Sequence, residues 1–347
     1  WGGMEERVGI HVNATLFRNF DSAKGFLLGE ANKGLKAMFI MMNAARIGVS
    51  VQGYGLSEVA YQNAVEYAND RIQGRSLTGV KAADKAADPI IVHPDVRRML
   101  MNAKSFNEAA RAAALWCAML VDLSHKAETE EERQSADDIV SLLTPVMKGV
   151  FTDRGYEFAT SSQQVYGGHG YVAEWGMEQF VRDARITQIY EGANGIQALD
   201  LVGRKLPAHG GRGIQAFFKL VGRFLSDNKD NEKLAVFTTT LSAALSDLQT
   251  ATMWLMQNAM TNPDNAGAGS TPFMHLFGHV LLGFQWAQMA KISIEKLDNG
   301  TDDPTFFEDK LITGRYYMKR RLPETKSLLA ELEAGAEDVM ALDAANF

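Results

Sequence analysis

Long stretches with helical periodicity constrain this fold more than any other feature. In residues 32–69, apolar side chains recur at every third or fourth position, beginning with Leu35, Met38 and Met42. This spacing places them on one face of an α-helix. The same argument predicts helices over the ranges 94–127, 136–166, 174–184, 194–204, 213–227, 231–260, 271–298 and 305–336. The chain is therefore expected to be mainly α.

Breaks in this pattern divide the chain into three expected parts. Residues 7–30 mix β-branched and aromatic residues with turn formers, which predicts short strands and a hairpin turning at Asp21–Gly25. "PAHGGRGIQ" (207–215) is a Pro/Gly linker, and the acidic run Glu128–Glu132 is expected to be a solvated loop. We predict a β-segment in 1–30, a four-helix bundle in 31–206 and a second helical bundle in 212–347.

Composition excludes several classes of function. The net charge of −7 disfavours nonspecific binding to nucleic acid or to anionic membrane surfaces. The single cysteine, Cys117, can form no disulfide within the chain, so a reducing, cytoplasmic setting is expected. The chain starts at Trp1 rather than at Met, which suggests a truncated or processed start.

The range Ala266–Ala290 contains no Lys, Arg, Asp or Glu. It is long enough to cross a membrane, but it contains four glycines together with His275 and His279. We therefore predict a buried bundle helix. The two histidines have the spacing of metal ligands on a helix, but no third ligand accompanies them, so no metal site is expected.

Glu191 is the main candidate for acid–base chemistry. The segment "VRDARITQIYEGANGIQ" (181–197) places this carboxylate between Tyr190 and Gly192, in a break between two predicted helices. A carboxylate in an apolar setting can act as a general base near neutral pH. Gly192 allows a ligand to approach the backbone closely. An exposed loop acid is the alternative interpretation.

Other candidates for binding are two arginine positions and a glycine-rich turn. Arg46 borders the apolar face of the first helix, so its guanidinium must find an anion or extend to solvent. Arg71 and Arg75 follow the same helix, and guanidinium groups suit a pyrophosphate; surface solubility is the alternative. In "QQVYGGHGY" (163–171), the paired glycines either let the backbone meet a flat or phosphorylated ligand or simply cap the helix.

Taken together, these motifs resemble the C-terminal part of the acyl-CoA dehydrogenases. "QVYGGHGYVAEWGMEQFVRDARITQIYEGANGIQ" is similar in order and spacing to the family's Q-x-x-G-G-x-G-[FY] turn, R-D-[AS]-[RK] segment and I-Y-E-G-T motif. "MNAARIGVSVQGYGLSEVAYQNAVEYANDRIQGR" resembles the first C-terminal helix of the family, and residues 7–30 resemble the end of its central β-domain. Residues 212–347 resemble the extra helical domain of a long subgroup, which includes 3-methylmercaptopropionyl-CoA dehydrogenases.

The resemblance implies a flavin-dependent oxidoreductase that converts an acyl-CoA thioester to the trans-2-enoyl-CoA. Glu191 would take the α-proton while the β-hydride passes to N5 of FAD. The implied substrate-binding residues are Tyr190, Gly192 and Arg46. The implied FAD-binding residues are Arg71, which would meet the cofactor of a partner subunit, together with Gln164, Gly167 and Gly168. An electron-transfer flavoprotein is the implied electron acceptor, and a homodimer or dimer of dimers is the implied assembly.

The chain also departs from the family pattern. Ala193 replaces the usual threonine after Y-E-G, and Ala45 stands where some relatives place their base, so Glu191 is the base that the pattern offers. The family's N-terminal helical domain and most of its β-domain have no counterpart, so the chain is expected to be a fragment. Two alternatives stay open: an acyl-CoA oxidase that uses O₂, and a non-catalytic helical oligomerisation module.

Overall fold

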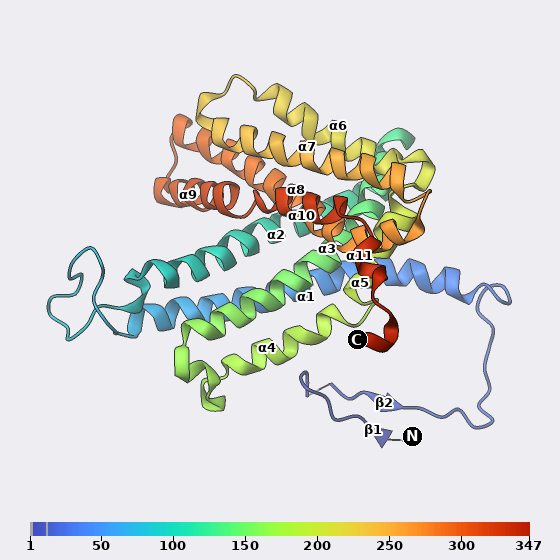
Figure 1. The fold of residues 1–347 in the computed structure, drawn as a ribbon, viewed down its shortest axis with the longest axis horizontal. Helices are drawn as coiled ribbons and strands as arrows, with labels where there is room; N and C mark the ends of the chain where they lie inside the picture. Colours follow the sequence, from blue (N-terminus) through green and yellow to red (C-terminus); the bar gives the residue numbers. More distant parts are fainter. Residues whose placement is uncertain (1–2, 12) are drawn as a thin grey trace.

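The first half of the chain folds into a bundle of long helices. The computed structural model describes residues 3–11 and 13–347, without the side chains of Lys36, Phe39 and Ile40. Within that part the chain is mostly helical, which confirms the predicted fold class (Figure 1). The long helices α1 (Gly34–Asp70), α2 (Pro94–Lys126) and α3 (Glu130–Val165) pack on one another, and the shorter α4 (Met177–Arg185) and α5 (Asn194–Asp200) cover α3.

The second half forms another helical bundle around one central helix, α8. Its helices are α6 (Arg212–Asp227), α7 (Ala235–Asn258), α8 (Pro263–Asn299), α9 (Pro304–Arg320), α10 (Glu324–Glu333) and α11 (Glu337–Ala341). Helix α8 packs against α7, α9 and α10, and also against α2, α3 and α5 of the first bundle. One hydrophobic core therefore runs through both bundles, from Ala103 on α2 to Leu332 on α10.

The uncharged stretch of α8 is buried as predicted. Every residue from Leu276 to Ala287 is buried, because neighbouring helices surround this part of α8. In the described part of the chain, no helix is both long and apolar enough to span a bilayer. Cys117 is likewise fully buried, and burial raises the pKa of its thiol to about 11, so it acts as a small core residue.

Short helical segments connect the long helices. The 3₁₀ segments are Ile90–Val92, Gly167–Tyr171, Ala173–Trp175, Ile186–Gln188, Ala208–Gly210, Glu232–Leu234 and Ala344–Asn346. A single π-helical turn, Leu201–Lys205, continues α5. Such turns are frequent near functional sites.

Helix α3 begins earlier than the sequence pattern predicts. The acidic run was expected to be a loop and the helix to start near residue 136, but α3 starts at Glu130. Thr129 and Glu132 form a reciprocal capping box, with each side chain bonded to the backbone N–H of the other at 3.2 Å. Three glutamates in the first turn also complement the helix dipole. The expected solvated loop is therefore wrong.

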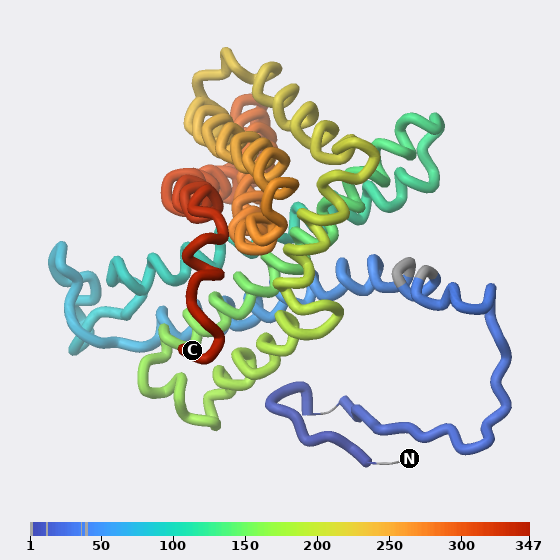
Figure 2. The backbone as a smooth tube through the Cα atoms, turned by 45° about the vertical axis from the view of Figure 1, so that its right-hand side comes forward, coloured from blue at the N-terminus to red at the C-terminus, as the bar shows by residue number. Residues whose placement is uncertain are grey.

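In the described part of the N-terminal segment, two short strands form a sheet, but one of them lies before the predicted range 7–30 and the predicted turn is not formed. Strands β1 (Gly3–Met4) and β2 (Leu16–Phe17) pair antiparallel, whereas residues 21–25 lie beyond β2 in the extended stretch that leads to α1 (Figure 2). The connection between the strands is instead held by α4. The Arg182 guanidinium donates to Val8 O at 2.8 Å, and Ile10 N–H donates to Asp183 Oδ1 at 2.7 Å.

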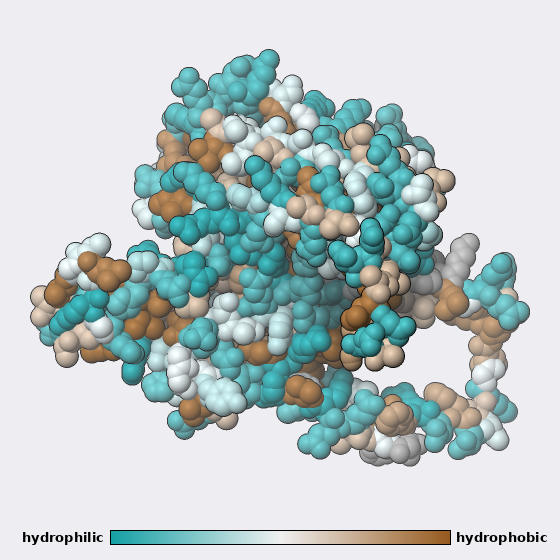
Figure 3. Space-filling model, in the orientation of Figure 1, coloured by the Kyte–Doolittle hydropathy of each residue, from teal (hydrophilic) through white to brown (hydrophobic). Residues whose placement is uncertain are grey.

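Apolar side chains lie exposed along this segment and at the start of α1. Phe26 and Leu28 are 95% and 98% exposed, and apolar residues are visible along the segment at the lower right of Figure 3. On α1, Leu35 and Met41 are exposed, whereas Arg46, Val49 and Ser50 are buried. The predicted apolar face of α1 is therefore buried only from about its fourth turn onward.

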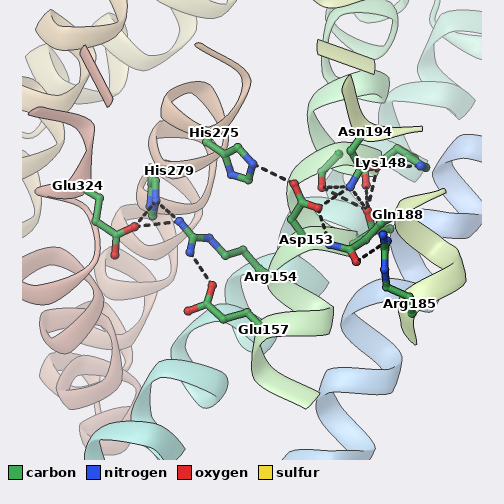
Figure 4. A network of polar contacts seen from close by, with 12 residues as sticks. Lys148, Asp153, Arg154, Glu157, Arg185, Gln188, Asn194, His275, His279 and Glu324 are labelled. Atoms are coloured by element: carbon green, nitrogen blue, oxygen red, sulfur yellow. Dashed lines mark hydrogen bonds and ion pairs between the residues drawn. The ribbon is translucent and has the colours of Figure 1, made fainter. Parts of the chain in front are cut away.

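A partly buried polar cluster joins the two bundles. Arg154 on α3 donates to Glu324 on α10 at 2.8 Å and pairs with Glu157 at 2.5 Å (Figure 4). His279 on α8 lies between Glu324, at 3.0 Å from Nε2, and the Tyr317 hydroxyl, at 3.1 Å from Nδ1. Nε2 of His279 thus lies between an acceptor, the Glu324 carboxylate, and a donor, the Arg154 guanidinium at 3.1 Å.

The charge states in this cluster follow from burial and from the neighbouring guanidinium groups. Burial lowers the pKa of His279 below its ordinary value, and the charge of Arg154 adds to this. Burial opposes ionisation of Glu324, but its contacts with His279, Arg321 and Arg154 outweigh that effect and hold its pKa low. At neutral pH the cluster therefore holds a neutral His279 and an ionised Glu324.

We predict that the protein loses stability as the pH falls below the ordinary histidine range. A folded-state pKa below the unfolded value means that the unfolded chain binds more protons, so stability falls as pH drops through the interval between the two values. The pKa values of His279 and Glu324 are both lowered in the folded state, so both groups make the protein less stable as the pH falls. Urea unfolding at pH 7, 6 and 5 should show a decreasing free energy of unfolding, and His279→Gln should flatten this dependence. Equal slopes for the variant and the parent protein would contradict the assignment.

Candidate active site

Arg46 is buried beneath the segment that carries Glu191. Its side chain is 3% exposed, and Nη1 donates to Asp200 Oδ2 on α5 at 2.8 Å. Of the two outcomes that the sequence left open, an anion or extension to solvent, the structure shows the anion, Asp200. The other oxygen of Asp200 accepts from Arg204 Nε at 2.6 Å. Asp200, the last residue of α5 before the π-helical turn, therefore supplies the counter-charge for Arg46 on α1.

Glu191 and Gly192 form a turn with a left-handed backbone. Their φ angles are +56° and +89°, a region in which a non-glycine residue such as Glu191 is strained by roughly 1 kcal/mol or more. Gln197 holds the turn, because its Nε2 donates to both Glu191 O and Gly192 O at 3.0 Å. A Cβ on residue 192 would lie 2.5 Å from this nitrogen and 3.8 Å from Arg46 Nη2. Only glycine fits the turn without moving these groups.

Lys148 on α3 supports the same turn from inside the protein. Its side chain is fully buried, and Nζ donates to Gly192 O and to Asn194 Oδ1, both at 2.7 Å. Burial lowers the pKa of Lys148 to about 8, with Arg46 adding to the shift and Asp153 and Glu191 opposing it. Sequence reasoning missed this residue. The available signal was a lysine within the apolar run "LLTPVMKGVF".

The side chains around the turn leave the Glu191 carboxylate available. Glu191 is partly buried, and no hydrogen bond or ion pair within the described residues holds its carboxylate. Tyr190 donates its hydroxyl to Gln52 Oε1 on α1, and burial raises the pKa of this phenol. The arrangement therefore places one free carboxylate above two buried cations, Lys148 and Arg46.

The residues with an implied role in FAD binding lie at the other end of the bundle. Gln164 follows Lys148 by 16 positions on α3, which corresponds to about 24 Å along a helix. Arg71 ends α1 close to the same place, because Tyr67 of α1 stacks on Tyr166 at 4.0 Å. The structure therefore separates the expected residues into two sets: Arg46, Tyr190, Glu191 and Gly192 at the turn, and Arg71, Gln164, Gly167 and Gly168 at the far end.

The far set presents open backbone and exposed polar side chains. Gly167 has a φ of +56°, and a Cβ at Gly167 or Gly168 would meet no atom within 4 Å. Arg71 and Gln164 are exposed. The guanidinium of Arg71, the amide of Gln164 and the open backbone of the two glycines suit a diphosphate and its adenosine. This end of the bundle could therefore hold the pyrophosphate and adenosine end of FAD.

Other residues near this end are structural. Arg75 donates to Ala82 O at 2.9 Å and to Asp88 Oδ1 at 3.2 Å, so it holds the loop after α1 rather than a free anion. Nδ1 of His169 lies 2.9 Å from the Tyr67 hydroxyl, within hydrogen-bond distance. The His169 ring stacks on the Trp175 ring, with 4.5 Å between their centroids. The sequence could not separate Arg75 from Arg71, because only the fold shows which guanidinium has a partner.

The histidine pair of α8 contacts carboxylates on other helices. His275 Nε2 lies 2.9 Å from Asp153 Oδ2, and His279 bonds Glu324 as described above. Among the described residues, no group of three or more His, Cys, Asp or Glu side chains is arranged to hold a metal ion.

Both halves of the chain match known protein families. Residues 32–206 match the family model described as "Acyl-CoA dehydrogenase, C-terminal domain", and residues 214–343 match "Acetyl-CoA dehydrogenase C-terminal like". The chain is 38% identical to 3-methylmercaptopropionyl-CoA dehydrogenase of Ruegeria pomeroyi, over 92% of this chain and 54% of that protein. It is 32% identical to the broad-specificity linear acyl-CoA dehydrogenase FadE5 of Mycobacterium tuberculosis, over 99% of this chain and 58% of that protein.

Solved structures show the same fold. The Caenorhabditis elegans protein ACDH-11, in complex with C11-CoA, superimposes with a TM-score of 0.74 at 18% identity, over 98% of this chain and 54% of that chain. An acyl-CoA dehydrogenase from Bacillus anthracis, complexed with FAD, gives a TM-score of 0.72 at 19% identity, over 95% of this chain and 56% of that chain. The chain spans about half the length of the curated relatives it matches. By sequence and by fold, it belongs to the acyl-CoA dehydrogenase family.

Proposed function

We propose that the protein containing this chain is an acyl-CoA dehydrogenase that oxidises the α,β carbon–carbon bond of an acyl-CoA thioester, with Glu191 as the base. One observation carries the proposal. A carboxylate that no hydrogen bond or ion pair within the described residues holds is carried by a strained turn, and the buried Lys148 bonds the carbonyl of the next residue. Strain of this kind is typical of functional sites.

The residues of this chain account for proton removal and for carbonyl polarisation. Glu191 takes the α-proton of the thioester. The backbone N–H of Glu191 polarises the thioester carbonyl, since no hydrogen bond within the described residues uses this N–H. Tyr190 and Gly192 border the acyl chain, and Arg46 fixes α1 against α5 beneath them. FAD, when bound, supplies the acceptor for the hydride from the β-carbon, and an electron-transfer flavoprotein then takes the electrons.

The separation of the two residue sets supports a cofactor shared between subunits. Gln164 lies about 24 Å along α3 from Lys148, which supports the Glu191 turn, so the far set is distant from a flavin ring placed at the base. We therefore assign Arg71, Gln164, Gly167 and Gly168 to the pyrophosphate and adenosine end of FAD, with Arg71 meeting the cofactor of a partner subunit. This assignment requires at least a homodimer.

Helix α2 offers a face for such an assembly. Leu115, Met119 and Leu123 recur every four residues and are 66%, 51% and 39% exposed. This spacing puts them on one side of the helix, while Ala113, Cys117 and Leu120 on the other side are buried. An exposed apolar stripe on a long helix is typical of a helix that packs against another subunit.

Replacing Glu191 by glutamine should abolish dehydrogenation and leave FAD bound. The substitution keeps the size of the side chain but removes the base, and loss of a general base typically costs about 10²–10⁴-fold in kcat. The measurement is bleaching of flavin absorbance by a panel of acyl-CoAs under anaerobic conditions. Glu174→Gln, at an exposed position before α4, is the matched control and should keep full activity. Normal turnover by Glu191→Gln would contradict the base assignment, and rapid peroxide formation in air would indicate an oxidase.

Placing charge on the α2 stripe should dissociate the subunits. Leu115→Glu combined with Met119→Glu puts two carboxylates into an apolar contact, where each is costly to bury. Light scattering after size exclusion should show a smaller species that has lost FAD. Met253→Glu, at an equally exposed methionine on α7, should leave the mass unchanged. An unchanged mass for the α2 variant would exclude this face as the interface.

A further inference from the structure

We infer that His275 and Asp153 are positioning residues through which the C-terminal bundle holds the turn that carries Glu191. The effect on reaction rate rests on the function proposed above, but the mechanical link does not. The C-terminal bundle thereby becomes part of the support of the active site.

Asp153 on α3 connects the C-terminal bundle to both sides of the turn. Its Oδ2 accepts from His275 Nε2 of α8 at 2.9 Å (Figure 4). Its Oδ1 accepts from Gln188 Nε2 and from Asn194 Nδ2, each at 2.7 Å. Gln188 ends the 3₁₀ segment before the turn, and Asn194 begins α5 after it. One carboxylate therefore holds both ends of the segment 189–193.

Asn194 extends this link to the buried lysine. Its Oδ1 accepts from Lys148 Nζ, which also bonds Gly192 O, both at 2.7 Å. Its Nδ2 also lies 2.9 Å from Thr152 Oγ1. A continuous set of hydrogen bonds thus runs from α8 through Asp153 and Asn194 to the carbonyl next to Glu191.

The charges fit this arrangement. Burial opposes ionisation of Asp153, but the hydrogen bond and charge of His275, with the amides of Gln188 and Asn194, hold its pKa below the ordinary value. Asp153 is therefore an acceptor only, and Nε2 of His275 must carry a proton and donate. The two side chains are 25% and 15% exposed, so little water competes for this bond.

His279 provides a natural comparison one helical turn further along α8. It too bonds a carboxylate and lies beside an α3 side chain, with Glu324 at 3.0 Å and Arg154 at 3.1 Å. None of its bonds involves residues 186–197. Both histidines join the same two bundles, but only His275 is linked to the turn.

Amide hydrogen exchange on the complete, FAD-bound protein tests the mechanical link. His275→Leu removes the donor, whereas His275→Gln keeps an N–H that can bond Asp153. We expect His275→Leu to speed exchange in a peptide covering 186–197 by about tenfold, because local opening becomes easier. His275→Gln should restore most of the protection. His279→Gln should change exchange at its own junction but not in 186–197.

Kinetics on the same variants test the consequence for the proposed reaction. A small displacement of a reacting group can cost a large factor in rate, so kcat of His275→Leu should fall about tenfold while KM and FAD content stay within about twofold. Asp153→Asn should have a similar effect, and the double variant should be no worse than either single one, as expected for residues acting in one set of contacts.

The outcomes separate this inference from the proposed function. Unchanged exchange in 186–197 for His275→Leu, or an equal change for His279→Gln, overturns the link whatever the activity. Faster exchange confined to His275→Leu, together with full activity of Glu191→Gln, supports the link and overturns the function. Faster exchange with unchanged kcat shows that the link exists but does not position the base, which overturns the inference as stated.

Discussion

The structure depends on the contact between the Lys148 ammonium and the Gly192 carbonyl. A fully buried lysine is costly unless its donors are satisfied, and here two oxygens at 2.7 Å satisfy it. These oxygens are in place only if residues 191 and 192 adopt left-handed backbone angles. The strain of the turn and the burial of the charge therefore stabilise one another. The position of the Glu191 carboxylate at the surface of the bundle follows from this pair of constraints.

The two bundles share a large hydrophobic core, so the C-terminal bundle is part of the packing that holds the first bundle together. Helix α8 packs against helices of both halves, and its buried stretch has apolar neighbours on all sides. Polar contacts are inserted into that packing at only a few places, where His275 and His279 contact Asp153 and Glu324. Because a buried polar group needs a specific partner, these contacts determine how the bundles are aligned.

Some of the fold and part of the site could be predicted from local pattern. The helical periods located most of the helices, because apolar spacing reflects which face is buried. They predicted one helix over 305–336, however, where the structure has α9 and α10. For Arg46 the sequence left either an anion or extension to solvent, and the structure shows the anion, Asp200. The start of α3 was missed because composition favoured a loop, while the capping box of Thr129 and Glu132 favoured a helix. The hairpin turn was missed because contacts with Arg182 and Asp183, distant in sequence, set the path of the segment.

The sequence by itself determined the mainly helical class, the family, and a lone carboxylate followed by glycine between two helices. The tertiary structure decided which polar groups meet: Lys148 with the Gly192 carbonyl, Asp153 with His275, and Arg46 with Asp200. These partners are 44, 122 and 154 residues apart along the chain. Hydrogen bonds act over about 3 Å, so no local pattern can show them, and only the packing of helices brings their atoms within range.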